Sequence, residues 1–124
     1  MKKGKRFLAY IMSLAIALNV LVLPAATANA YTKDIASLTV EYFNHSWASA
    51  STNSYGYVSV GLSINTSDGR GNATGSNGYA SIGVVLDARS GYVITSASST
   101  HTDPDIRMRG TWYDLTDVYS FYYY

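Results

Sequence analysis

A strict alternation of apolar and polar residues is the feature that most limits what this chain can fold into. Across residues 57–64 every second residue is Val, Leu or Ile, and the residues between them are Tyr, Ser or Gly. The same period of two runs through residues 79–86. Successive side chains of a β-strand point to opposite faces, so each segment has one apolar and one mostly polar face. The pattern predicts two β-strands that each cover a core.

Weaker segments of the same kind extend this prediction along the chain. Residues 87–91 form a short turn that ends in Gly, so we expect a hairpin between 79–86 and a strand at 92–100. Further strands are expected at 38–43, 46–52, 106–113 and 118–124. The predicted fold is all-β: a small antiparallel β-sandwich or open barrel of about six or seven short strands.

The first 30 residues have the three-part order of a secretory signal peptide. Four basic residues within the first six positions precede an apolar run at 7–23, and Pro24 ends that run. Ala28 and Ala30 then occupy the −3 and −1 positions of an A-x-A cleavage site. We expect a cleaved signal helix at 1–30 and a single secreted, extracellular β-domain at 31–124. Cleavage after Ala28 and an uncleaved membrane anchor are the alternatives.

Removal of this leader changes the charge of the chain. Residues 31–124 carry five basic and eight acidic side chains, a formal charge of −3. Such a domain lacks the basic surface that binds phosphate backbones, which argues against nucleic acid and, after cleavage, against a membrane as partner. The chain has no cysteine, which favours a bacterial secreted protein, and no motif in it calls for a cofactor.

Residues 65–78 are the longest stretch without a large apolar side chain, and they predict a loop. Within it, Asp68 and Asn72 offer oxygen ligands of the kind that Ca²⁺ prefers, and the glycines permit tight turns. The stretch has only one carboxylate, and a solvated hairpin loop is the simpler interpretation.

A second candidate cluster is His101, Asp103 and Asp105, which follow one another at a spacing of two. Imidazole and carboxylate groups on one face can bind a metal ion or transfer protons, as in a small hydrolase. Pro104 interrupts the strand, however, and Asp-Pro-Asp is also ordinary turn chemistry. The other histidine, His45, lies between aromatic residues and is expected to be packed against them.

Eleven tyrosines follow residue 30, and tyrosine combines a large apolar ring with a hydroxyl group. This density predicts a non-catalytic domain that binds a cell-wall, glycan or protein surface through tyrosine-rich faces. The candidate binding residues are Tyr55, Tyr57, Tyr79, Trp112, Tyr122 and Tyr124. The uncharged strands at 58–64 and 82–86 also raise the possibility of self-association.

The chain ends with Ser120, Phe121, Tyr122 and Tyr123 before a last tyrosine. This ending, behind an export leader and in a cysteine-free β-rich chain, is similar to that of the lactococcin-type bacteriocins that act on cell-wall synthesis. The resemblance implies a secreted antibacterial protein. A bacteriocin-like function and a hydrolase that uses His101 with Asp103 or Asp105 are therefore the alternatives to simple surface binding.

Overall fold

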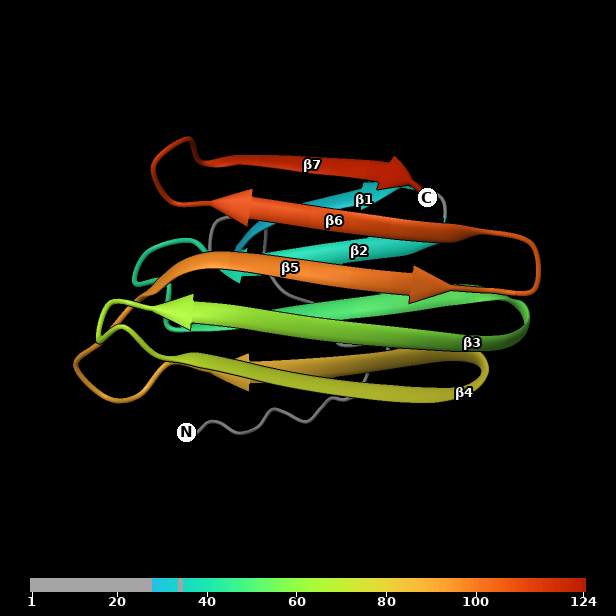
Figure 1. Cartoon of the computed structure of the whole chain (residues 1–124), viewed down its shortest axis with the longest axis horizontal. Helices are drawn as coiled ribbons and strands as arrows, with labels where there is room; N and C mark the ends of the chain where they lie inside the picture. The colour runs from blue at the N-terminus through green and yellow to red at the C-terminus, as the bar shows by residue number, and fades with distance from the viewer. Residues whose placement is uncertain (1–27, 34) are drawn as a thin grey trace.

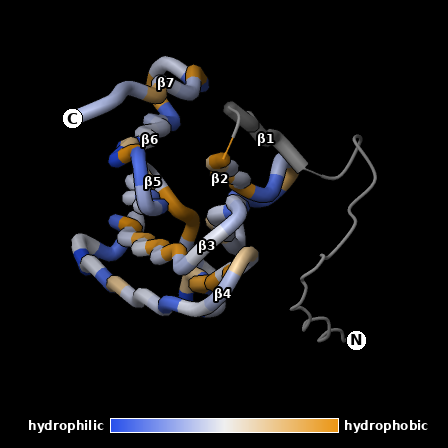
Figure 2. The backbone as a smooth tube through the Cα atoms, turned by 90° about the vertical axis from the view of Figure 1, so that its right-hand side faces the viewer, coloured by the Kyte–Doolittle hydropathy of each residue, from blue (hydrophilic) through white to orange (hydrophobic). Residues whose placement is uncertain are grey.

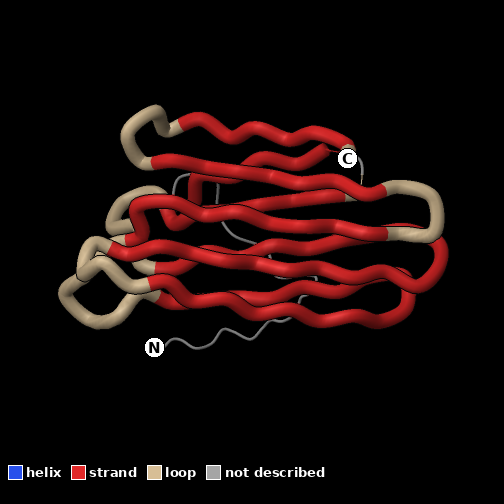
Figure 3. Tube along the Cα trace, in the orientation of Figure 1, coloured by secondary structure: helices blue, strands red, loops and turns tan. Residues whose placement is uncertain are grey.

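The computed structural model describes residues 28–33 and 35–124, and this part of the chain consists of strands and connections without a helix (Figures 1 and 3). The strands are β1 (Ala28–Lys33), β2 (Ala36–Glu41), β3 (Trp47–Thr66), β4 (Gly71–Asp87), β5 (Ile94–Thr102), β6 (Arg107–Tyr113) and β7 (Val118–Tyr123). Residues 1–27 of the predicted signal peptide lie outside the described residues, and its last three residues belong to β1.

The strands form one antiparallel sheet in the order β1-β2-β3-β5-β6-β7, with β4 attached to β3. β3 is 20 residues long and has different neighbours along its two halves. Its first half pairs with β2, from Ala48 to Thr52, and its second half pairs with β5, from Ser59 to Thr66. β4 pairs with both halves of β3 on the side opposite to these strands.

A bend shared by β3 and β4 folds this sheet over on itself. The β3–β4 register shifts between Asn53 and Tyr57, and on β4 Ala80 has a φ of 69°. Beyond the bend both strands continue in the facing layer (Figure 1). The two ends of β3 consequently approach each other. The Ile94 N–H donates to the carbonyl of His45, just before β3, at 2.8 Å, while Ile94 pairs with Thr66, the last residue of β3.

The core lies between the two layers. β2 and the first half of β3 contribute Leu38, Val40, Ala48 and Ala50, and the facing layer contributes Val60, Leu62, Ile64, Ile94, Ala97 and Trp112. Apolar and polar residues are interleaved along these strands (Figure 2). One polar contact also joins the layers, because the Tyr119 hydroxyl accepts a hydrogen bond from the Val40 N–H at 3.0 Å. Burial raises the pKa of Tyr119 above its ordinary value, despite the opposing effect of that hydrogen bond.

The prediction of an all-β antiparallel sandwich or open barrel is confirmed: the sheet is an open half-barrel whose end strands, β1 and β7, contact each other without pairing. No helix in the described part of the chain is long and apolar enough to cross a membrane.

Three details of the predicted strand pattern were wrong. The segments at 46–52 and 57–64 are one strand, β3, because the polar stretch between them continues through the bend. The predicted loop at 65–78 is mostly the first half of β4, with a tight turn at 67–70. The predicted hairpin through 87–91 does not form, since β4 and β5 pair with opposite sides of β3.

Gly110 on β6 allows a close approach of β7 and provides a test of this packing. A Cβ atom at Gly110 would stand 2.7 Å from Phe121 Cε1 and 2.8 Å from Ser99 Oγ. At Gly83 on β4 the nearest atoms would be at 3.5 and 3.6 Å, which is ordinary contact. We expect Gly110→Ala to lower the free energy of unfolding by about 1–3 kcal/mol. The matched Gly83→Ala variant should change it by less than about 1 kcal/mol. Equal urea midpoints for the two variants would contradict this packing.

Candidate functional site

Three exposed tyrosines gather where β3 and β4 bend, and we call this the bend site. Tyr55, Tyr57 and Tyr79 are 65%, 77% and 65% exposed. Tyr57 and Tyr79 are directly opposite each other in the β3–β4 ladder, next to the register shift. Their rings meet edge to face, with centroids 5.2 Å apart and planes at 82°. Two large aromatic faces are therefore held at a fixed angle in solvent.

The connection between β5 and β6 packs against the bend and adds a carboxylate to the bend site. Gly56 allows this approach, because a Cβ atom there would stand 2.8 Å from Pro104 Cγ. The Tyr55 hydroxyl donates a hydrogen bond to the Asp105 carboxylate. This hydrogen bond, then partial desolvation and the charges of Asp105 and Asp103, raise the pKa of the Tyr55 hydroxyl above its ordinary value.

Asp103 fixes the conformation of that connection. Its carboxylate accepts hydrogen bonds from the backbone N–H groups of Asp105 and Ile106, at 2.8 and 2.6 Å, and from the Ser54 hydroxyl at 2.8 Å. Desolvation acts to raise the pKa of Asp103, but the hydrogen bonds from Ser54 and the two N–H groups outweigh it and hold the pKa below its usual range. Asp103 thus positions Asp105 beside Tyr55.

Amide and hydroxyl groups complete the polar part of the bend site. The Ser81 hydroxyl donates to Asn53 Oδ1 at 2.6 Å across the β3–β4 ladder, and both residues are exposed. The bend site therefore presents aromatic rings beside a carboxylate, an amide and a hydroxyl. Rings that stack and polar groups that donate and accept hydrogen bonds are what a polyhydroxylated ligand requires.

His101 lies in the interior near the bend, with both ring nitrogens hydrogen-bonded. Thr52 Oγ1 lies 2.9 Å from Nδ1, and Ser99 Oγ lies 2.7 Å from Nε2. The Thr52 hydroxyl donates to the Ser59 carbonyl at 2.8 Å, so its oxygen accepts from Nδ1–H, and Ser99 donates to Nε2. Burial lowers the pKa of His101 to about 4, against the opposing effect of a hydrogen bond to the Ser51 backbone.

The three residues of the predicted His101–Asp105 cluster therefore have different environments. His101 is fully buried, Asp103 is bound to its own turn, and Asp105 is exposed beside Tyr55. In the described part of the chain, no group of three or more His, Cys, Asp or Glu side chains could hold a metal ion. The arrangement is that of a structural polar network around a neutral histidine.

Of the other predicted metal ligands, Asp68 lies within the tight turn and Asn72 lies just after it on β4. Asp68 accepts a hydrogen bond from the Thr66 hydroxyl and lies 3.9 Å from the side chains of Arg70 and Arg89. The Thr66 hydrogen bond is the main cause that lowers the pKa of Asp68, and desolvation opposes it. Asn72 is exposed on β4, and its Oδ1 accepts from the Ala73 N–H at 2.9 Å. Asp68 therefore stabilises the turn.

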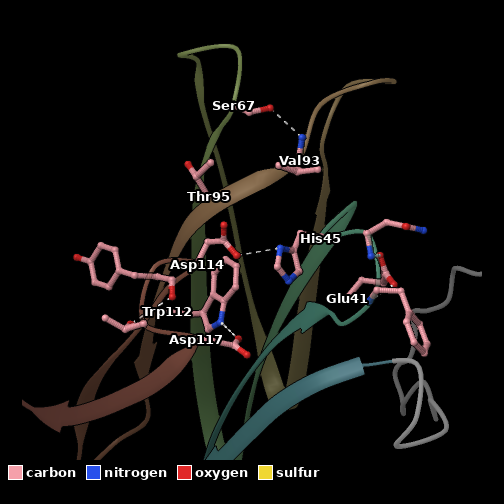
Figure 4. A network of polar contacts seen from close by, with 12 residues as sticks. Glu41, His45, Ser67, Val93, Thr95, Trp112, Asp114 and Asp117 are labelled. Atoms are coloured by element: carbon pink, nitrogen blue, oxygen red, sulfur yellow. Dashed lines mark hydrogen bonds and ion pairs between the residues drawn. The ribbon is translucent and has the colours of Figure 1, made fainter.

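A second polar network lies at the end of the half-barrel where the two ends of β3 meet (Figure 4). His45 Nδ1 is 3.3 Å from Asp114 Oδ1, and the His45 ring packs edge to face on Trp112 with centroids 5.0 Å apart. Trp112 Nε1–H donates to Asp117 Oδ1 at 3.1 Å. His45 is thus packed against an aromatic residue as the sequence predicts, although its partner is Trp112 of β6. These contacts join the β2–β3 connection to the end of β6 and the β6–β7 connection, which are distant in the sequence.

The fold places the six candidate binding residues, five tyrosines and Trp112, in three separate locations. Three of them form the bend site, whereas Trp112 is fully buried in the core and presents no exposed face. Tyr122 and Tyr124 are exposed at the end of the chain, where the Arg109 guanidinium lies 5.1 Å from the centre of the Tyr124 ring. Tyr122 lies on β7 and Tyr124 directly follows it, at the other edge of the layer from β4.

Sequence reasoning missed Asn53 and Ser81 as members of the bend site. Only the register of β3 and β4 places these two polar residues beside the tyrosines. Comparisons of the chain with protein-family models, curated proteins and solved structures give no match. The functional interpretation therefore rests on the geometry of the bend site.

The buried His101 predicts a pH dependence of stability. In the unfolded chain its pKa is about 6.5, and in the folded protein it is about 4. Between these values the unfolded chain binds more protons, so stability falls as the pH decreases from 6.5 towards 4. The expected loss is about 3 kcal/mol. It is measured by urea unfolding across this range.

His101→Gln is the matched control, because glutamine keeps a donor and an acceptor but does not titrate. We expect a flatter dependence of unfolding free energy on pH for this variant. Identical slopes for the native protein and His101→Gln would show that His101 does not cause the dependence.

Proposed function

We propose that this protein is a secreted, non-catalytic β-domain that binds the glycan of a cell-wall surface through the bend site. The observation that carries the proposal is the exposed cluster of Tyr55, Tyr57 and Tyr79 at one end of a rigid half-barrel. Exposed single apolar residues are normal on a protein surface, but a cluster of large rings beside polar groups is typical of a binding site.

The geometry of the rings suits a sugar ligand. Tyr57 and Tyr79 already restrict each other through their edge-to-face contact, so little side-chain freedom is lost when a ligand covers them. Burial of ring surface contributes about 25 cal/mol for each Å² removed from water. A pyranose has apolar C–H faces that stack on such rings.

The polar groups around the rings supply the hydrogen bonds that the hydroxyl groups of a sugar need. Asp105 accepts at one side of the bend site, and the Asn53–Ser81 pair offers an amide and a hydroxyl. Asp103 and Ser54 keep the Asp105 connection in place before any ligand arrives. This preorganisation favours binding because the ordering cost is already met in the folded chain.

The environment of His101 supports binding without catalysis. A general base needs an accessible nitrogen near its substrate, whereas both nitrogens of His101 are hydrogen-bonded inside the core. Its lowered pKa keeps the ring neutral at neutral pH. The residue stabilises the strands that carry the tyrosines.

A pull-down of the purified protein on intact cell walls and on isolated wall glycan tests the proposal. We expect Tyr57→Ala and Tyr79→Ala each to weaken binding about tenfold or more, as loss of a central aromatic contact does. Tyr57→Phe should retain most of the affinity because the stacking face remains.

The matched control is Tyr113→Ala, since Tyr113 is also exposed but lies at the opposite end of β6 from the bend. Binding of this variant should equal that of the native protein. Retention of full affinity by a folded Tyr57→Ala, Tyr79→Ala double variant would rule out the bend site.

A further inference from the structure

β4 is an edge strand along its whole length. Its only strand partner among the described residues is β3, whereas β3 also pairs with β2 and β5 on its other side. In an antiparallel ladder, alternate residues direct their N–H and C=O groups away from the partner strand. β4 therefore presents a row of main-chain donors and acceptors to its outer side.

On either side of the bend, this edge lacks the charged residues and proline that usually prevent pairing with another strand. Exposed edges are normally short, or they carry charged residues or proline. β4 is 17 residues long, and residues 71–86 contain neither a charged side chain nor a proline. The bend at Ala80 divides the edge into two halves.

The second half of β4 also leaves apolar surface uncovered. Ile82, Val84 and Leu86 point inwards and pack against the core, but each is only partly buried because, among the described residues, no strand pairs with the outer edge of β4. Val85, on the outer face, is 42% exposed. A further strand beside this half would cover the partly buried apolar row.

We propose that this strand is the second half of β4 from another copy of the protein, so that two copies pair antiparallel about Val84. In this register Val84 lies opposite Val84 of the second copy, and Ile82 lies opposite its Leu86. The layer that contains the second half of β4 in one copy then continues into the same layer of the other copy across a twofold axis. Each copy uses the same surface.

The sequence of this half is complementary to itself, which is why a second copy is the occupant. The register centred on Val84 places all three inward apolar residues opposite apolar residues of the copy. Asp87 falls opposite Ser81, so no like charges oppose each other across the pair. A shift by two residues along the copy would lose apolar pairs, and a shift by one would place inward residues opposite outward ones.

Because the chain has no cysteine, a single introduced cysteine reports this register directly. Directly opposite residues of antiparallel strands have Cα atoms about 4.5–5.5 Å apart, a separation that a disulfide spans. We expect Val84→Cys to form a covalent dimer under mild oxidation, seen on a non-reducing gel. Val118→Cys, which places the thiol on the exposed edge strand β7, should form at least about tenfold less dimer.

A second measurement does not depend on a substitution that faces the core. Analytical ultracentrifugation of the purified native protein should show a dimer. Val85 lies opposite Gly83 of the second copy, so Val85→Lys places two lysines at diagonal positions on one face of the pair and should weaken the dimer about tenfold or more. Val118→Lys should leave the dimer unchanged. A monomeric native protein, or equal cross-linking of Val84→Cys and Val118→Cys, would overturn the proposal. Neither result bears on glycan binding, which is measured separately at the bend site.

Discussion

The bend in the paired strands β3 and β4 is the constraint on which the rest of the structure depends. Because both strands pass from one layer to the other, the β3–β4 ladder contributes two strands to each layer, on either side of the register shift at the bend. β2 and β5 then pair with different halves of the same strand, and the half-barrel closes around the core between them. The bend also brings Tyr57 of β3 and Tyr79 of β4 together on a surface that faces solvent.

Hydrogen bonds between polar side chains hold the bend end of the molecule together. Thr52 and Ser99 bind the two nitrogens of His101 on the inner side, and Ser54 binds Asp103 on the outer side. Buried polar groups of this kind are costly when unsatisfied but rigidify a structure when every partner is present. This satisfied network joins β5 to β3, the strand that carries Tyr55 and Tyr57.

The fold class could be predicted from the sequence because period-two alternation at 57–64 fits a half-buried β-strand and does not fit an amphipathic helix. The first half of β4 could not, since an edge strand rich in Gly, Asn and Ser gains its stability from the ladder to β3 and has the composition of a loop. Tyr57 and Tyr79 were recognisable as outward residues, but only the strand register makes them neighbours. Trp112 was misjudged as a binding residue because alternation gives the face of a strand without saying how deep that face is buried.

The long β3–β4 ladder has a consequence for the order in which the chain folds. Its pairs begin at Asn65 and Gly71, only a few residues apart, and extend outwards to Trp47 and Asp87. The hairpin can therefore zip from its turn with little loop-closure cost at each step. β2 and β5 can pair with β3 only once the two halves of β3 are ordered, so we expect the hairpin to be the folding nucleus. The remaining strands then add to the β3 side of this hairpin, which the middle of the chain forms.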